Sequence, residues 1–596
     1  MLSAQRIDEN PCRPRHFRPP PPCAPVVPDE RAAAFLDSCR SRLVMTAALF
    51  AVVFIVVTLR LVDVVLLSGV PVDPRLASNH AAAAAAVALP RPVRADILDR
   101  NGRLLATTLD SPSLYADPRQ IQNADEATKA IRSVFPQLDV NEVRAKLTSG
   151  KSFAWIRRRL TPRQEYDINK LGIPGLYFDH ESRRIYPFGD LAAHVIGFCG
   201  IDNNGLAGIE RALDSTVKSS RDPVQLSIDA RVQFILHEEL TKVMADFTAK
   251  GAAGIIMDVH TGEIIAMVSL PDFDPNHPNR GEAQMTPAEA KDRVFNKVTL
   301  GDYELGSVFK TFNTAMALDG GTATLTKTYD AAHDIKIGRF TISDYHGKHR
   351  ALSVPEIYMY SSNIGSARMA LEAGAERQRA FLSKLGLLKP VPIEFDEVAK
   401  PHYPNPWREV NTITIAYGHG ISVTPLHAIT AVSAMVNGGV LHEPTLRKVS
   451  PGAEPAGDRV ISSKTSEQMR KLMRLVVQYG TAKMAQAPGY VVGGKTGTAE
   501  KNVGGHYIEK KLLSDFVGAF PMQDPKYAFL LLVDEPHPNK DSHGYATAGW
   551  TVVPATSRLI ERIAPILGVP PVDEASPSIT QALAIASLQG KKIEDY

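Results

Sequence analysis

The chain has 596 residues, which is enough for several domains and a large hydrophobic core. Apolar residues make up 44% of it and charged residues 22%, an ordinary balance that excludes no class of globular protein. The formal net charge is only +3, and there is neither a long basic run nor an RNA-binding aromatic motif, so we expect no nucleic-acid partner.

A proline-rich segment and an apolar run open the chain. The composition of residues 1–42 predicts a disordered or polyproline-II tail without a packed core. Residues 43–59 carry no charge, and the apolar character continues beyond Arg60 if that side chain reaches the membrane surface. We expect an uncleaved transmembrane anchor at residues 43–67, because the segment before it is too long for a signal peptide. A buried core helix and a cleaved signal peptide are the alternatives.

Arginines and cysteines indicate the orientation of this run. The arginines that precede it are Arg6, Arg13, Arg15, Arg18, Arg31, Arg40 and Arg42. Since positive charge favours the cytoplasmic side, we expect a cytoplasmic N-terminus and an exported region after residue 67. Three of the 4 cysteines precede the run, on the reducing side. The exported one, Cys199, is expected to be a buried, inert thiol.

Residues 68–222 are predicted to form a structural module of strands and helices, here called the pedestal. Residues 94–103 have the pattern of a hairpin with an Asn-Gly turn. Helices are predicted at residues 124–135 and 140–147. No catalytic constellation occurs in this module.

Residues 223–570 are predicted to form a larger α+β domain, followed by a loosely packed tail at residues 571–596. The main predicted elements are strands at 224–229, 489–498, 513–520 and 527–533, a hairpin at 254–267, and helices at 231–247 and 552–566. Strands first, helices in the middle and strands again at the end favour one antiparallel sheet covered by helices.

Ser307-Val308-Phe309-Lys310 is the first of three short motifs that carry the chemistry. An apolar-periodic stretch follows the serine, so we expect an amphipathic helix that begins at Ser307. Residues three apart share a helix face, and Lys310 can therefore reach the Ser307 hydroxyl. A serine is a weak nucleophile until a base takes its proton. Lys310 can be that base if it is neutral, a state favoured by burial and by a neighbouring cation.

Lys495-Thr496-Gly497-Thr498 lies in a predicted strand rich in glycine, which is typical of close approach by a ligand. Lys495 is the candidate for the neighbouring cation. The hydroxyls of Thr496 and Thr498, together with Lys495, suit a substrate carboxylate. The backbone N–H groups of Ser307 and Thr498 can form an oxyanion hole for the reacting carbonyl.

Ser361-Ser362-Asn363 is the remaining motif. Ser361 can relay a proton between Lys310, Lys495 and a leaving amine. Asn363 can both donate to and accept from a backbone amide. In the order S-x-x-K, S-x-N, K-T-G, the motifs are typical of enzymes that open a peptide-like carbonyl with an active serine. We therefore expect one site assembled from three distant segments.

Two competing patterns are weaker. A second S-x-x-K begins at Ser215, but it lies in a polar stretch without a following apolar helix. The K-T-G-like sequence at His260-Thr261-Gly262 is explained by a hairpin turn. The histidines show no metal-binding spacing, and no G-x-S-x-G elbow surrounds a serine, so neither a metal site nor a Ser-His-Asp triad is expected.

Four further blocks of sequence carry a resemblance to a known family. They are Arg94-Ala-Asp-Ile-Leu-Asp-Arg-Asn-Gly102, Arg184-Ile-Tyr-Pro-Phe-Gly-Asp-Leu-Ala-Ala-His-Val-Ile-Gly-Phe198, Gly205-Leu-Ala-Gly-Ile-Glu210 and Tyr417-Gly-His-Gly-Ile-Ser-Val-Thr-Pro-Leu426. In these blocks and the three motifs the chain resembles the class B penicillin-binding proteins of the division-associated FtsI type. Ala95 stands where the family usually has glycine, and Leu305 stands where it usually has proline.

The resemblance implies the penicillin-binding transpeptidase fold, with an antiparallel sheet covered by helices, an all-helical subdomain, an elongated pedestal of the dimerisation type and a single anchor. It implies a D,D-transpeptidase whose Ser307 attacks the D-Ala-D-Ala bond of a peptidoglycan stem peptide and is acylated by β-lactams. No metal or organic cofactor is implied. The implied location is the inner membrane, with a periplasmic catalytic domain at the division septum, beside an FtsW-type glycosyltransferase and other divisome proteins.

Other proteins with the same serine and lysine chemistry are alternatives. They are an elongation-type transpeptidase, a D,D-carboxypeptidase, a β-lactamase, and a non-catalytic β-lactam sensor or septal scaffold. The large pedestal and the lack of a recognisable deacylation carboxylate argue against a β-lactamase. The presence of all three motifs argues against a scaffold, and the single apolar run argues against a sensor.

Overall fold

The chain divides into two compact units, Met1–Pro90 and Arg91–Tyr596. The computed structural model describes residues 30–62, 94–338, 340–450, 452–453, 455–503 and 506–588. In the first unit the described residues form one helix, α1 (Glu30–Val62). Its stretch Ser41–Leu59 is apolar and long enough to cross a membrane, and the side chains described there are exposed.

Helix α1 begins earlier than the composition of the tail predicted. It starts at Glu30, so residues 30–42 are helical rather than disordered or extended as polyproline II. The last proline of the tail is Pro28, and the run of three alanines that follows it has high helix propensity. The rest of the predicted tail, residues 1–29, and the end of the predicted anchor, residues 63–67, lie outside the described residues.

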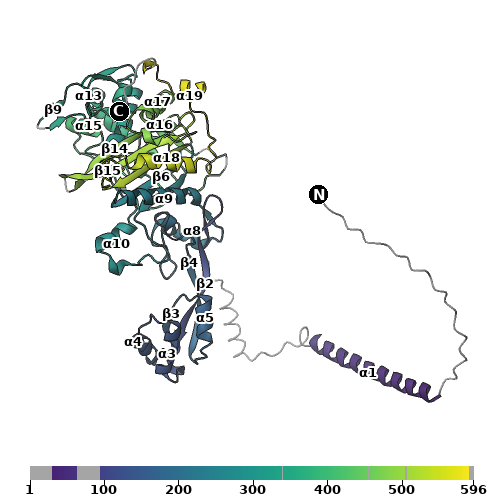
Figure 1. The fold of residues 1–596 in the computed structure, drawn as a ribbon. Coiled ribbons are helices and arrows are strands. Elements are labelled where there is room, and N and C mark those ends of the chain that lie inside the picture. Colours follow the sequence, from purple (N-terminus) through teal and green to yellow (C-terminus); the bar gives the residue numbers. More distant parts are fainter. Residues whose placement is uncertain are drawn as a thin grey trace, which may run out of the picture. The chain divides into compact units, whose positions relative to one another are not determined.

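The second unit opens with the pedestal, which is built on a five-stranded sheet (Figure 1). Its strands are β1 (Ile97–Leu98), β2 (Leu104–Ala116), β3 (Ala154–Arg157), β4 (Leu176–Ile185) and β5 (Val224–Gln225). Strand β2 pairs antiparallel with β1, β3 and β4. The predicted hairpin is confirmed: Gly102 lies in the turn between β1 and β2 with a φ of +83°, which glycine adopts without steric cost.

Helices cover the outer part of this sheet and enclose a core of their own. The helices of the pedestal are α3 (Ala124–Val134), α4 (Val140–Leu147), α5 (Pro162–Asn169), α6 (Ala193–Ile196), α7 (Gly208–Ala212) and α8 (Asp214–Ser219), with 3₁₀ turns η2 (Pro118–Gln120) and η3 (Gly189–Ala192). Helices α3 and α4 confirm the two predicted ones. Asn123 and Asp139 cap their first turns, and Leu114, Ile131 and Phe135 are fully buried between helices and sheet.

A buried ion network holds the base of the pedestal. The Glu210 carboxylate accepts hydrogen bonds from Nε of Arg94 and from Nε of Arg184, each at 2.6 Å. All three side chains are at most 2% exposed. Cys199 lies beside this network and is half-buried rather than fully buried. Burial and the nearby Glu210 raise the pKa of its thiol to about 12, which keeps it protonated and inert as expected.

The junction between pedestal and larger domain is continuous. Strand β5, expected to open the larger domain, pairs in parallel with β1 of the pedestal, and the next residue, Leu226, bridges to Arg447. Ile97 of the pedestal and Ile255 of the larger domain belong to one hydrophobic core. The predicted boundary at residue 222 is therefore not accompanied by a break in packing.

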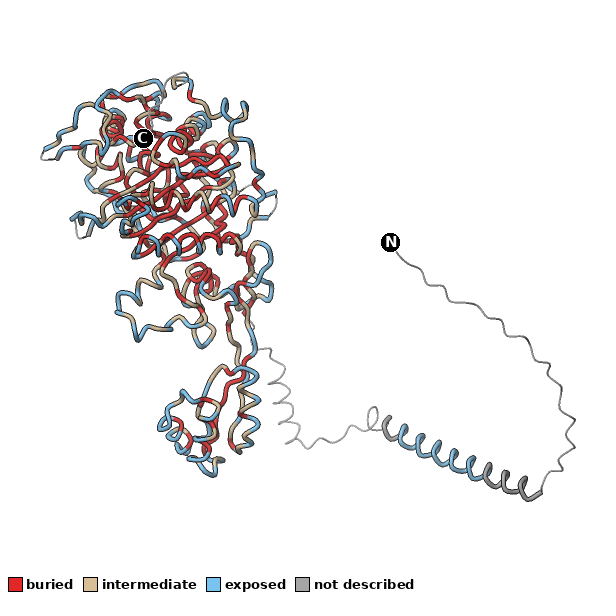
Figure 2. Tube along the Cα trace, viewed as in Figure 1, coloured by how far each residue is buried: buried red, intermediate tan, exposed pale blue. Residues whose placement is uncertain are grey.

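The larger domain is organised around a five-stranded antiparallel sheet in the order β14-β15-β16-β6-β7. These strands are β6 (Gly251–Asp258), β7 (Ile264–Leu270), β14 (Gly493–Val503), β15 (His506–Phe520) and β16 (Tyr527–Asp534). They confirm the predicted hairpin and the three late strands. Buried residues run along this sheet (Figure 2), because helices cover both of its faces.

Helices α9 and α18 contact each other and the sheet, and α16 and α17 also pack against it (Figure 1). The helices of the domain are α9 (Ala230–Asp246), α10 (Pro287–Val294), α11 (Phe309–Asp319), α12 (Val354–Met359), α13 (Asn363–Ala373), α14 (Ala375–Lys384), α15 (Glu409–Ile415), α16 (Pro425–Val436), α17 (Ser463–Tyr479), α18 (Val552–Ile563) and α19 (Pro577–Ala582). Every residue of α16 is buried, in keeping with its mainly apolar sequence.

Helices α11 to α15 contact one another and form the helical subdomain. Short strands and turns complete the domain: β8 (Thr328–Asp330), β9 (Ile335–Ile337), β10 (Phe340–Ile342), β11 (Ala351–Ser353), β12 (Val440–His442), β13 (Gly457–Arg459), η4 (Glu282–Gln284), η5 (Gly306–Val308), η6 (Lys483–Ala485) and η7 (Ala586–Leu588). The fold is thus the predicted α+β arrangement of an antiparallel sheet and a helical subdomain.

The C-terminal tail is packed more closely than predicted. Ile585 is 6% exposed and belongs to the core of the domain, and Ile579 and Leu583 pack against that core. Glu574 accepts a 2.8 Å hydrogen bond from Arg474 of α17. The described part of the tail, up to residue 588, is therefore part of the domain, because its apolar side chains pack against the hydrophobic core.

The substitution Glu210→Gln tests the ion network at the base of the pedestal. It leaves two buried guanidinium groups without their shared countercharge, and we expect a loss of about 3–5 kcal/mol in the free energy of unfolding. The measurement is chemical unfolding followed by tryptophan fluorescence. The matched control is Glu142→Gln, which removes an exposed ion pair with Lys146 and is expected to cost about 0.5 kcal/mol. Equal losses in the two variants would contradict the importance of the network.

Candidate active site

Ser307 sits in a tight turn directly before helix α11. Residues Gly306–Val308 form a 3₁₀ turn, η5, and the α-helix begins at Phe309, so the predicted helix starts with a tighter turn than expected. Gly306 has a φ of +50°, and a Cβ at this position would lie 2.9 Å from the carbonyl oxygen of Thr498. The turn that carries Ser307 and the Lys-Thr-Gly-Thr strand are therefore in direct contact.

Lys310 lies one turn along the helix and reaches back to the serine, as predicted. Its Nζ is 2.9 Å from the Ser307 hydroxyl oxygen. The same nitrogen donates to the carbonyl oxygen of Ser361 at 2.6 Å and to Oδ1 of Asn363 at 2.7 Å. The side chain is 1% exposed, whereas Ser307 remains partly accessible. The amine is thus held beneath an accessible hydroxyl.

Ser361 bridges the two lysines of the site. Its hydroxyl oxygen lies 3.0 Å from Nζ of Lys310 and 3.0 Å from Nζ of Lys495. The residue has a φ of +60°, a left-handed conformation that costs a non-glycine residue about 1–2 kcal/mol. This backbone conformation presents both the carbonyl and the hydroxyl of Ser361 to Lys310. The strain thus falls on a residue whose hydroxyl contacts both amines.

Asn363 begins helix α13 and is held by Asp344, a residue that the sequence did not single out. Asp344 accepts hydrogen bonds from the backbone N–H groups of Asn363 and Ile364 and from the Ser362 hydroxyl, at 2.6, 3.0 and 2.6 Å. The Asn363 side chain donates to Ser343 and accepts from Lys310, so its oxygen orients the lysine instead of being free for a substrate amide. A lone aspartate in a turn gave no signal in the sequence.

Strand β14 brings the third motif to the other two. Lys495 is fully buried and donates to Ser361 and to the Thr496 carbonyl oxygen, 3.1 Å away. The Thr496 hydroxyl is 2.6 Å from that of Thr481, another residue that the sequence did not indicate. The hydroxyl oxygen of Thr498 accepts from the backbone N–H of Ala548 at 3.2 Å, which leaves its own hydrogen available.

Burial changes the protonation of both lysines. The pKa of Lys310 falls well below its ordinary value, because the amine is desolvated and lies near the positive charge of Lys495. Burial lowers the pKa of Lys495 to about 7, against the opposing effect of Asp515. Both amines are thus more easily neutralised than an exposed lysine, which is what a general base at Lys310 requires. The role of Lys495 as the neighbouring cation stays a prediction.

In the competing S-x-x-K motif at Ser215, the lysine does not contact the serine. Lys218 donates to Asp214 and Asn204, at 2.7 and 2.5 Å, and not to Ser215. His260 lies in the predicted turn between β6 and β7.

His419, which the sequence analysis treated as a structural histidine, lies near the site. The pKa of His419 is lowered by burial and by Lys310, and its ring makes tilted contacts with the rings of Tyr417 and Tyr507.

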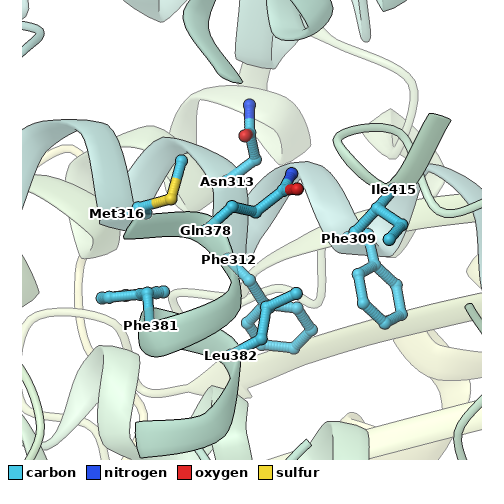
Figure 3. Close-up of a pocket in the computed structure, with 8 residues that line it drawn as sticks. All are labelled: Phe309, Phe312, Asn313, Met316, Gln378, Phe381, Leu382 and Ile415. Atoms are coloured by element: carbon cyan, nitrogen blue, oxygen red, sulfur yellow. The ribbon is translucent and has the colours of Figure 1, made fainter. Parts of the chain in front are cut away.

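A different face of α11 anchors the helix in the subdomain. Figure 3 shows a small cavity there, between α11, α14 and α15. The residues that line it are Phe309, Phe312, Asn313, Met316, Gln378, Phe381, Leu382 and Ile415. Because these side chains are mainly large and apolar, their packing fixes the rotation of α11 and so the direction in which Lys310 points.

Comparison with known proteins agrees with this geometry. The model of the penicillin-binding protein transpeptidase domain matches residues 252–552, and that of the penicillin-binding protein dimerisation domain matches residues 90–244. A probable peptidoglycan D,D-transpeptidase FtsI from Caulobacter vibrioides is 41% identical over 489 residues, which cover 80% of this chain and 82% of that protein. The chain is a class B penicillin-binding protein of the FtsI type. It is a peptidoglycan D,D-transpeptidase.

Two further comparisons place this class B penicillin-binding protein among its relatives. A probable peptidoglycan D,D-transpeptidase PenA from Neisseria meningitidis is 30% identical over 512 residues, with 80% of this chain and 85% of that protein covered. The crystal structure of penicillin-binding protein 3 from Mycobacterium tuberculosis, complexed with aztreonam, has a TM-score of 0.62 at 23% identity, covering 81% of this chain and 98% of that one. The latter shows the shared fold. The family and the long apolar stretch Ser41–Leu59 of α1 indicate a membrane-anchored penicillin-binding protein with a periplasmic catalytic domain.

The close approach of β14 to the turn that carries Ser307 predicts that Gly497 tolerates no side chain. A Cβ there would lie 2.3 Å from the Leu305 carbonyl oxygen and 2.4 Å from Oδ1 of Asp515. Gly497→Ala must displace the turn that carries Ser307, and a shift of about 1 Å is expected to lower kcat/KM for a stem-peptide donor about 100-fold. The control is Gly200→Ala in the pedestal, whose Cβ would meet the flexible Leu206 side chain at 3.3 Å and a backbone atom no closer than 3.8 Å. Activity of Gly497→Ala close to the wild type would refute the contact.

Proposed function

We propose that Ser307 is the nucleophile of this transpeptidase, Lys310 its general base, and Lys495 the cation that keeps Lys310 neutral. The observation that carries the proposal is the 2.9 Å contact between Nζ of Lys310 and Oγ of Ser307, beneath a partly exposed serine and beside a second buried amine. A buried lysine with a lowered pKa and a hydrogen bond to a serine has little structural purpose, since its desolvation costs stability.

The first half of the reaction is acylation. Lys310 takes the proton of the Ser307 hydroxyl as the serine oxygen attacks the carbonyl carbon of the penultimate D-Ala of a stem peptide. The negative charge on the carbonyl oxygen is stabilised by the backbone N–H groups of Ser307 and Thr498. The proton passes through the Ser361 hydroxyl to the leaving amine, the peptide bond breaks, and the terminal D-Ala departs.

Substrate binding uses the strand of the third motif. The terminal carboxylate of the stem peptide binds at the hydroxyls of Thr496 and Thr498 and the charge of Lys495, while Gly497 allows β14 to lie against the turn that carries Ser307. In the second half of the reaction, the amine of a neighbouring stem peptide attacks the carbonyl carbon of the acyl-enzyme. The ester bond to Ser307 breaks, and the proton of the amine returns to the Ser307 oxygen through Ser361 and Lys310. The product is a cross-link between two glycan strands.

The proposal extends to covalent penicillin binding and to cell division. A β-lactam ring resembles the D-Ala-D-Ala bond, so its carbonyl is expected to acylate Ser307. The anchor at α1 has a cytoplasmic N-terminus on the positive-inside rule. The resemblance to the FtsI type supports a role of this protein in peptidoglycan synthesis at the division septum, beside an FtsW-type glycosyltransferase and other divisome proteins.

Mass spectrometry after exposure to penicillin tests the nucleophile. We expect one adduct per chain, on Ser307, that is absent in Ser307→Ala. The matched control is Ser215→Ala, which alters the competing S-x-x-K motif and is expected to keep the adduct. An adduct on another residue, or none on folded wild-type protein, would overturn the assignment. An adduct that hydrolyses within seconds would favour a β-lactamase instead.

Fluorescence microscopy tests the place of action. A fluorescent protein fused before residue 1 is expected to form a band at midcell in dividing cells, because the FtsI type acts in septal wall synthesis. A fusion that is spread along the lateral wall of dividing cells would favour the elongation-type alternative. The same fusion with Ser307→Ala separates localisation from activity, since loss of the nucleophile leaves the described surfaces unchanged.

A further inference from the structure

A buried carboxyl lies behind the Lys-Thr-Gly strand and takes no part in the reaction described above. Asp515 is on β15, directly opposite Gly497 of β14 in the antiparallel register. It is fully buried. Among the described residues, neither of its side-chain oxygens has a hydrogen-bond partner. Burial raises the pKa of this carboxyl, and the charge of Lys495 opposes that rise. A carboxylate in such surroundings is costly, so Asp515 is ionised only as the partner of a cationic Lys495.

The pleat of the sheet directs Asp515 toward the catalytic face. Opposite residues of an antiparallel pair project to the same face, and so do alternate residues of one strand. Asp515 therefore shares a face with Gly497 and with Lys495, two residues earlier. The position of a Cβ on Gly497 is within 2.7 Å of both Asp515 oxygens and of the carbonyl oxygen of Leu305, which precedes the nucleophile's turn. The carboxyl is thus packed under that turn.

Few charged groups face this position. Asp515 is the one charged group that acts on Lys495 from β15, and Lys495 acts in turn on Lys310 from β14. Asp344 and His419 lie further out, beside Lys310. On the other neighbouring strand, β16, the residue opposite Asp515 is the apolar Leu532. The described charges form a series: a carboxyl, a buried amine and a second buried amine.

We propose that Asp515 is a positioning residue of the transpeptidase reaction, a buried countercharge that keeps Lys495 cationic. Loss of the proton from Lys495 leaves a buried carboxylate with no cation near it, so the pair retains its proton toward higher pH than an isolated buried lysine. The charge of Lys495 then keeps Lys310 neutral. Asp515 acts on Ser307 through two intermediaries and touches no reacting atom. The inference rests on the proposed function, which gives Lys495 and Lys310 these roles.

The pH dependence of acylation has two limbs on this view. The rate rises with pH as Lys310 loses its proton, and it falls at higher pH as Lys495 loses its own. The Asp515 carboxylate raises the pKa of Lys495 against the lowering by burial. Removing the carboxylate therefore lowers the pKa of Lys495 and moves the alkaline limb to lower pH. A purely structural role for Asp515 lowers the rate equally at every pH and leaves the limb in place.

The experiment is the pH–rate profile of Ser307 acylation by penicillin in the full chain, for the wild type and Asp515→Asn. Asparagine keeps the shape and removes the charge. We expect the alkaline limb to move down by about one pH unit. The matched control is Asp534→Asn on β16, a 5% exposed carboxylate that pairs with Lys501, 2.7 Å away, and its limb is expected to stay. If Asp515→Asn does not fold, Asp515→Ser carries the same test.

The outcomes separate the two proposals. A wild-type protein that is acylated on Ser307, with identical limbs in the wild type and Asp515→Asn, overturns the role of Asp515 and leaves the proposed function intact. A wild-type protein that is not acylated on Ser307 overturns the proposed nucleophile. In that event the pH profile of transpeptidation from a stem-peptide donor still measures whether removal of Asp515 moves the alkaline limb.

Discussion

Two lysine side chains are buried within hydrogen-bond distance of the same serine hydroxyl, and the rest of the site depends on this arrangement. Lys310 and Lys495 each lie 3.0 Å from Oγ of Ser361. Neither amine can be fully charged there without compensation, because both are removed from water. Burial thus converts two ordinary lysines into a base with a lowered pKa and a cation near its titration point. Everything around them serves either to bury them or to hold them in register.

The fold supplies burial from two directions. Helix α11 carries Lys310 and is fixed in the subdomain by its apolar contacts with α14 and α15. The sheet supplies Lys495 on β14, whose neighbour β15 places Asp515 behind it. The helical subdomain and the sheet meet at glycine residues, because their backbones approach too closely to leave room for a side chain. Gly418, with a φ of +85°, shows the same need, since a Cβ there would lie 1.9 Å from the Gly306 carbonyl oxygen.

The sequence predicted the elements well where the signal was local. The helices α3 and α4, the hairpin of β6 and β7, and the late strands β14 to β16 follow from apolar periodicity and turn residues, which depend on neighbours in the chain. Predictions that depended on composition alone were weaker. The tail before the apolar run is helical from Glu30, and the C-terminal segment packs through residues such as Ile585. Composition reports average polarity and not which side chains find a partner.

In the candidate site, too, residues with a local sequence signal were predicted, and residues that depend on distant partners were not. Ser307, Lys310 and Lys495 were recognisable because each belongs to a short motif with a known chemical use. Asp344, Thr481 and Asp515 were not, because each is a single polar residue whose importance comes from a partner distant in the chain. The alternative use of the Asn363 oxygen, as an acceptor for Lys310, was also beyond the reach of spacing arguments.

By itself the sequence determined the kind of chemistry: a serine with a lysine one helical turn away, two further motifs, and the order in which they occur. It also determined the elements that carry them, since helix and strand periods are local properties of a chain. Only the tertiary structure decided how that chemistry is controlled. The charge of a lysine depends on what surrounds it in three dimensions, and the burial of Lys310 and Lys495, the strain at Ser361 and the carboxyl of Asp515 arise where segments distant in the chain meet.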